Sequence, residues 1–231
     1  MAMVIKRGGR EVYVSGGGQS NPFDTLPIHL LEAIVQRLEA PERRVMRAVS
    51  KSWWQHVGEL VRNLRPTYLD SVHIQASFPK CTTLDLRSCV WQDQELLGLS
   101  KLPTLHRVTL PCGWSVSSTT VELLARGTGP NLQRLDLAGC KRINQASIHA
   151  VATECTQLSA LHLSWCPQLS DRSLESIATI RHLTRLDFAH NPLISSNGLG
   201  RLSELPTLTE LRLANCARLD DTTLSVLARL T

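Results

Sequence analysis

The chain has 231 residues and a net charge of +5 at pH 7, which fits one ordinary domain or two small ones and excludes a large multidomain machine. Leucine fills 38 of the 231 positions and aromatic residues only 4%, a composition typical of a regularly repeated packing unit. No apolar run reaches the length of a membrane span, and no basic stripe with stacking aromatic residues indicates nucleic acid, so we expect neither a membrane nor a nucleic-acid partner.

Residues 1–20 are predicted to be a flexible N-terminal tail. Gly16 to Gly18 lie in a polar stretch without the strand-to-helix context of a phosphate-binding loop, so a linker is the better interpretation. The basic residues of the first ten positions are not followed by an apolar stretch, and we therefore expect no secretory signal.

Residues 21–66 are predicted to form a small domain of three short helices. Leu30, Ile34 and Leu38 recur at helical spacing, and further apolar positions continue a helical pattern as far as Leu64. A domain of so few residues buries little surface alone, and we expect it to pack against the rest of the chain or against a partner.

Residues 67–80 are predicted to be a degenerate first strand or bridge. Leu69, Val72 and Ile74 echo the spacing of the strand motif that follows, but no helical half comes after them before Cys81. A shortened terminal unit of this kind would close the end of a repetitive core.

Residues 81–231 contain about six copies of the template L-x-x-L-x-L-x-x-(C/N). Their first positions are 81, 105, 132, 158, 183 and 208, a period within the leucine-rich-repeat range. Apolar residues at fixed offsets after each copy, such as Ile143, Ile148 and Val151, indicate a helix behind each strand. The predicted fold is an α/β leucine-rich-repeat solenoid with a parallel sheet on its concave face and helices on its convex face.

Four of the seven cysteines close a copy of the motif, where a turn between stacked units needs a small buried side chain. They are Cys89, Cys140, Cys166 and Cys216. The odd total, and the lack of C-x-x-C pairs or zinc-type spacing, argue for reduced thiols in an intracellular protein. We therefore expect no metal and no other cofactor, and a cytoplasmic or nuclear location.

Residues 131–140 and 168–174 resemble the cysteine-containing repeats of the F-box/leucine-rich-repeat family. Residues 22–65 are similar to that family's F-box, with Leu26-Pro27, Leu30-Leu31, Ile34, Leu38-Glu39-Ala40-Pro41 and Val49-Ser50-Lys51-Ser52-Trp53 standing at its pattern positions. Two positions depart from the pattern: Ser50 replaces the usual cysteine, and Arg43-Arg44-Val45 replaces the usual Asp-Leu-Leu.

The resemblance implies a non-catalytic subunit of an SCF (Skp–cullin–F-box) ubiquitin ligase. In that family the F-box docks a Skp-type adaptor, which leads to a cullin–RING core, and the repeats capture the protein to be ubiquitinated. The adaptor-binding residues that it implies are Leu26, Pro27, Leu30, Leu31, Ile34, Val49 and Trp53. Alternatively, Ile34, Val49 and Trp53 close the core of the F-box itself.

Candidate substrate contacts come from strand positions that face outward on the concave face, and from the rim of that face. They are Arg107, Arg134, Asp136, His162, Trp165, Arg185, Asp187 and Arg212. One hypothesis is that these residues bind a polar or modified peptide. The other is that arginine–aspartate pairs, such as Arg134 with Asp136 or Arg185 with Asp187, only keep the face soluble.

No catalytic motif of the HExxH, GxSxG, GxxxxGK[ST] or GxGxxG type occurs in the sequence. We therefore expect no enzyme activity in the chain itself. The alternative to the ligase subunit is a non-catalytic leucine-rich-repeat scaffold that binds proteins, in which the helical segment serves only as an N-terminal cap.

Overall fold

The computed structural model divides the chain into two compact units, Met1–Leu60 and Val61–Thr231. The residues that it describes are 3–7, 10–14, 58–66, 74, 77–89, 99, 102, 104–220 and 222–228. The seven predicted adaptor-binding residues, and nearly all of the predicted three-helix domain, lie outside these residues.

In the first unit, strands β1 (Met3–Arg7) and β2 (Arg10–Val14) form an antiparallel pair. The prediction of a flexible tail over residues 1–20 is therefore wrong for these two segments. Both runs are rich in β-branched residues, and Gly8-Gly9 between them is a dipeptide typical of two-residue hairpins. The prediction of a flexible tail rests on the glycine-rich stretch at residues 16–18, which follows the hairpin.

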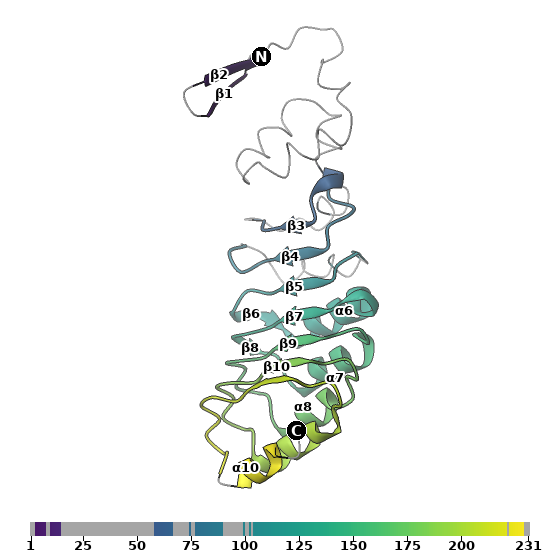
Figure 1. The fold of residues 1–231 in the computed structure, drawn as a ribbon, viewed down its shortest axis with the longest axis vertical. Helices are drawn as coiled ribbons and strands as arrows, with labels where there is room; N and C mark the ends of the chain where they lie inside the picture. Colours follow the sequence, from purple (N-terminus) through teal and green to yellow (C-terminus); the bar gives the residue numbers. More distant parts are fainter. Residues whose placement is uncertain are drawn as a thin grey trace. The chain divides into compact units, whose positions relative to one another are not determined.

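The second unit contains a parallel sheet of seven strands, in the order β11-β10-β9-β7-β5-β4-β3 (Figure 1). The strands are β3 (Asn63–Leu64), β4 (Thr83–Asp85), β5 (Arg107–Thr109), β7 (Arg134–Asp136), β9 (Ala160–His162), β10 (Arg185–Asp187) and β11 (Glu210–Arg212). Six of them coincide with the six predicted motif copies. The register also holds in the two weakest copies, because Leu84 pairs with Val108 and Val108 with Leu135.

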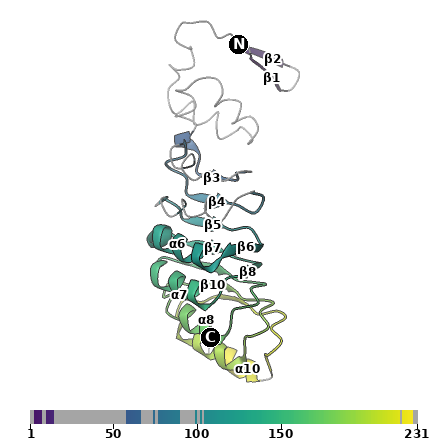
Figure 2. The same ribbon diagram turned by 180° about the vertical axis from the view of Figure 1, so that it is seen from behind.

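The helices line the other side of the strands (Figure 2). They are α6 (Ser118–Thr128), α7 (Gln145–Glu154), α8 (Asp171–Ile177), α9 (Ser196–Leu199) and α10 (Thr222–Leu227), with 3-10 turns η3 (Gly129–Asn131) and η4 (Gly200–Glu204). Caps start them where the sequence supplies an acceptor: Ser117 accepts from the Thr120 amide, and Asn144 forms a capping box with Ser147. A second parallel pair, β6 (Gly113–Ser117) with β8 (Cys140–Arg142), follows the turns of two repeats.

The first strand of the sheet lies earlier than predicted. It is β3, whose Asn63 pairs with Thr83 of β4, whereas Ile74 of the predicted strand is helical and buried. Residues 61–64 therefore belong to the repeat unit and not to a third helix of the preceding domain. A short apolar run fits a helix and a strand equally well by spacing alone, and here pairing with β4 decides.

Side chains at the closing position of the motif join each repeat to the one before it. Cys166 Sγ donates to the Leu137 carbonyl at 3.3 Å, and Cys216 Sγ donates to the Phe188 carbonyl at 3.4 Å. Asn191 does more: its Nδ2 donates to the Leu163 carbonyl at 2.9 Å, and its Oδ1 accepts from the Cys166 amide at 2.9 Å. The buried turns are thus satisfied by the neighbouring repeat.

We expect Asn191→Ala to lower the free energy of unfolding by about 3 kcal/mol, because it leaves the Cys166 amide and the Leu163 carbonyl buried without this partner. Urea denaturation followed by circular dichroism measures the change. Asn191→Cys should cost less, since cysteine donates to the equivalent carbonyl in two other repeats. Asn197→Ala, on the exposed side of α9, is the matched control and should change stability by less than about 0.5 kcal/mol.

Candidate functional site

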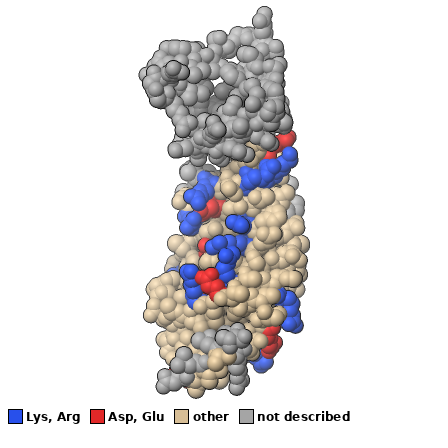
Figure 3. Space-filling view, in the orientation of Figure 1, with Lys and Arg blue, Asp and Glu red and all other residues tan. Residues whose placement is uncertain are grey.

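The outward positions of the strands form two columns of side chains across the sheet, as predicted; we call this surface the strand face. One column consists of Thr83, Arg107, Arg134, Ala160, Arg185 and Glu210, and the other of Asp85, Thr109, Asp136, His162, Asp187 and Arg212. Basic and acidic side chains are mixed over these strands (Figure 3). The parallel ladder thus brings together seven of the eight predicted substrate contacts, and the eighth, Trp165, lies at the rim.

The proposed arginine–aspartate pairs within β7 and β10 do not form; no ion pair joins Arg134 to Asp136 or Arg185 to Asp187. Instead, Asp136 Oδ1 accepts from the Ala138 amide at 3.1 Å, and Asp187 Oδ1 accepts from the Ala189 amide at 3.1 Å. Each carboxylate therefore closes the turn after its own strand, as aspartate commonly does two residues ahead of a free amide.

Arginines at the two ends of the sheet are neutralised by carboxylates. Arg212 bonds to Glu210 Oε1 at 2.7 Å and 2.9 Å. At the other end Asp85 pairs with Arg87 at 2.7 Å and with Arg65 at 3.2 Å. The hydrogen bond from Arg87 lowers the pKa of the Asp85 carboxyl.

Arginines in the middle of the sheet have no such partner. Within the described part of the chain, Arg107, Arg134 and Arg185 make no ion pair with a carboxylate. Arg134 Nη2 instead lies 3.2 Å from His162 Nε2. Since a guanidinium has no acceptor, Arg134 is the donor and Nε2 the acceptor of this hydrogen bond.

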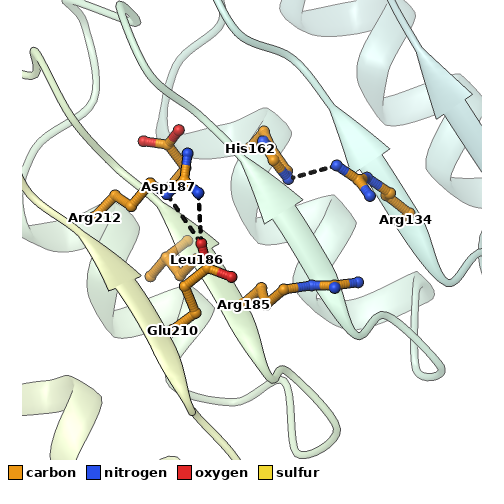
Figure 4. Close-up of a pocket in the computed structure, with 7 residues that line it drawn as sticks. All are labelled: Arg134, His162, Arg185, Leu186, Asp187, Glu210 and Arg212. Atoms are coloured by element: carbon orange, nitrogen blue, oxygen red, sulfur yellow. Dashed lines mark hydrogen bonds and ion pairs between the residues drawn. The ribbon is translucent and has the colours of Figure 1, made fainter.

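Arg134, His162 and Arg185 gather over β7, β9 and β10 around a shallow hollow of about 210 Å³ (Figure 4). We call it the arginine hollow. Its remaining lining residues are Leu186, Asp187, Glu210 and Arg212. Three arginines and two carboxylates thus line the hollow, and of the carboxylates Glu210 is paired with Arg212.

An aromatic pair, of which Trp165 is exposed and His190 is half-buried, lies at the rim, at the carboxyl ends of β9 and β10. The rings of Trp165 and His190 stack with centroids 3.8 Å apart and an interplanar angle of 11°. Trp165 remains 52% exposed, Lys141 Nζ lies 5.5 Å from its ring centre, and Asn215 Nδ2 lies 3.3 Å from His190 Nε2. The sequence predicts Trp165 at the rim but not His190, although both directly precede the closing residue of a repeat.

This rim pair has an unusual backbone. Trp165 and His190 both have φ of 60°, in the left-handed region, where Gly139 occupies the equivalent position of an earlier repeat with φ of 75°. The left-handed conformation costs a bulky residue about 1–2 kcal/mol relative to glycine. Asn215, at the equivalent position of the last repeat, shares the conformation with φ of 57°, so it recurs at this turn. We call Trp165 and His190 the rim platform.

The cysteines offer neither a metal site nor a reactive thiol of low pKa. All seven are free, and six of them are buried, with Cys112 exposed. Burial raises the pKa of the Cys155 and Cys166 thiols to about 12 and that of Cys81 to about 11. Among the described residues, no group of histidine, cysteine and carboxylate side chains could hold a metal ion, and no helix is long and apolar enough to cross a membrane.

Known proteins match the chain in two separate regions. The F-box domain family matches residues 23–58, and the leucine-rich-repeat family matches residues 154–178 and 179–203. F-box/LRR-repeat protein 4 of Bos taurus is 23% identical over 250 residues, which cover 90% of this chain and 40% of that protein. DNA repair protein rhp7 of Schizosaccharomyces pombe is 33% identical over 84 residues, 36% of this chain and 14% of that protein.

Among solved structures, an internalin of Listeria monocytogenes is similar with a TM-score of 0.51 and 16% identity, over 79% of this chain and 55% of that chain. At this identity the likeness concerns the fold alone. The described strands and helices, together with the two family matches, define a leucine-rich-repeat solenoid preceded by an F-box. The matches give the chain the domain composition of F-box/leucine-rich-repeat proteins, and it spans about two fifths of the length of its bovine relative.

We expect Gly139→Ala to destabilise the repeat unit by about 2 kcal/mol. The alanine would have to adopt the φ of +75° that Gly139 has, which strains its backbone. Its Cβ would also lie 2.8 Å from the Cys112 Cβ, which is a clash. Gly200→Ala is the control, because nothing lies within 4 Å of its added Cβ and its backbone is helical. Urea denaturation compares them; equal midpoints for the two variants would contradict the strain argument.

We expect one thiol, that of Cys112, to react quickly with a thiol reagent in the native protein, and all seven to react after denaturation. Raising the pH from 7.5 to 9.5 should leave the native count at one. An ordinary thiol ionises near pH 8.5, whereas burial keeps Cys81, Cys155 and Cys166 protonated beyond that pH. Rapid labelling of a second site, identified by peptide mapping, would contradict the described burial.

Proposed function

We propose that this chain is the substrate-recognition subunit of an SCF-type ubiquitin ligase. The observation that carries the proposal is the order of its parts: an F-box match at residues 23–58 directly precedes a repeat unit that begins at Val61. An F-box supplies a docking segment for a Skp-type adaptor, and a solenoid supplies a surface for a second protein. Both are needed in a protein that brings a substrate to a cullin–RING core.

The proposed mechanism is positioning without chemistry in this chain. The adaptor holds the F-box, the strand face holds the substrate, and the ubiquitin-loaded enzyme acts from elsewhere in the assembly. The rate enhancement then comes from effective concentration. A parallel sheet whose strands are bonded repeat to repeat suits this task, because its exposed side chains keep a fixed spacing.

The proposed adaptor contacts are the apolar residues of the F-box pattern. They are Leu26, Pro27, Leu30, Leu31, Ile34, Val49 and Trp53. The proposed substrate contacts lie on the strand face, whose central arginines have no carboxylate partner among the described residues, and on the rim platform with its exposed Trp165. Seven free cysteines suit a reducing compartment, and we therefore propose a cytoplasmic or nuclear location.

Co-purification with a Skp-type adaptor tests the proposal. The full chain should form a stable complex, and the double variant Leu30→Asp, Leu31→Asp should lose it, because two charges would enter an apolar interface. Gln36→Asp, which adds one negative charge at a polar position of the same segment, is the control and should keep the complex. The number of thiols that react quickly shows whether the repeat unit of each variant is still folded, because only Cys112 should react in the folded protein.

The alternative, a scaffold whose helical segment only caps the solenoid, predicts different results. The folded chain would then not bind the adaptor at all, and the Leu30, Leu31 variant would expose thiols that are buried in the native repeats. Adaptor binding that survives the double variant would overturn the assigned contacts.

A further inference from the structure

We propose that the arginine hollow binds one oxyanion group, a phosphorylated serine or threonine or a glutamate, carried by an extended peptide. This inference rests on the proposed function in one respect, since it names the class of substrate segment that the strand face would recognise. The hollow is defined by Arg134, His162 and Arg185 in the middle of the sheet.

The first argument is steric. Arg134 and Arg185 occupy the same column on β7 and β10, and the position between them on β9 is Ala160. Adjacent strands lie about 4.8 Å apart, so the two arginine Cα atoms are about 10 Å apart across a residue with one methyl group. Ala160 is fully buried beneath its neighbours, and its small side chain leaves room for the two long arginine side chains to reach over it.

The second argument is electrostatic. Neither guanidinium has an ion pair within the described residues, and the carboxylates that line the hollow are engaged: Asp187 by the Ala189 amide and Glu210 by Arg212. Arg134 Nη2 donates its hydrogen bond to His162 Nε2, which is not a carboxylate. An oxyanion would give both guanidiniums charge-assisted bonds, which are roughly twice as strong as a bond between neutral groups.

The same charges favour a peptide over a nucleic acid. A polyanionic backbone laid across the strand face would meet Asp85, Asp136 and Asp187 in the neighbouring column, and each would repel it. A single anionic side chain in the hollow meets only one of these three carboxylates, Asp187. The rim platform, which lies just beyond β9 and β10, offers Trp165 for an apolar residue of the same peptide.

Three fluorescent peptide libraries test the inference on the full chain. They have the same degenerate flanks and carry phosphoserine, glutamate or serine at the centre; a single-stranded DNA oligonucleotide is the fourth probe. In fluorescence polarisation, the phosphoserine or the glutamate library should bind at least about tenfold more tightly than the serine library. The difference should shrink as salt is raised. The two anionic libraries distinguish a modified residue from a plain acidic one.

Variants assign the binding to the hollow. Arg134→Gln and Arg185→Gln should each weaken anionic-library binding about tenfold, and Ala160→Glu should abolish it by placing a carboxylate between the guanidiniums. Arg126→Gln, an exposed arginine on α6, makes the same charge change outside the strand face and should have no effect. Thermal unfolding checks that each variant is folded.

Equal binding of the three libraries, or loss of binding in Arg126→Gln as large as in Arg134→Gln, would overturn the inference. Tighter binding of the oligonucleotide than of any peptide library would also overturn it. Adaptor co-purification is measured separately on the same variants and should be unchanged. If the anionic libraries bind no better than the serine library while the adaptor complex still forms, only the inference is contradicted. If the adaptor complex does not form, the proposed function is contradicted.

Discussion

Most of the structure depends on the fact that no repeat can satisfy its own buried backbone. Each inner strand finds its hydrogen-bond partners in the strands on either side, and the closing residues Cys140, Cys166, Asn191 and Cys216 bond to a carbonyl of the preceding repeat. Stability is therefore a property of neighbouring pairs. The small buried residue at the closing position, cysteine in most repeats and Asn191 in one, is required because only a compact donor fits between stacked turns.

The strand face follows from that stacking. Once the leucines fix the register, every outward residue has a defined neighbour in the next repeat, and a substitution changes the chemistry of the surface without changing the ladder. Arg134, Ala160 and Arg185 show the consequence. Arg134 and Arg185 lie two repeats apart in the sequence and yet line one hollow, because they share a column with the small Ala160 between them. The turns after the strands are used in a similar way, with Gly139 in one repeat and exposed aromatic residues in later ones.

The proposed function assigns different tasks to the F-box and to the repeats. An F-box needs an apolar surface of limited size that a dedicated adaptor covers, whereas a solenoid needs polar side chains at fixed spacing. The sequence reflects this division, since the excess of basic residues lies before residue 67 and the repeats are nearly balanced in charge. A balanced face with a few unpaired arginines favours selective recognition of one group over general attraction of polyanions.

The sequence by itself determined the repeat, its register, the buried cysteines and the outward columns, because a period-two strand pattern repeated at a constant interval leaves few other ways to bury so many leucines. It did not determine the start of the sheet at Asn63, the hairpin near the N-terminus, or the carboxylate partners. Short apolar runs are ambiguous until they pair, and Asp136 and Asp187 had two partners within reach, an arginine beside them and a turn amide. Only the tertiary structure decided that those carboxylates accept hydrogen bonds from the turn amides, which leaves Arg134 and Arg185 without a carboxylate partner among the described residues.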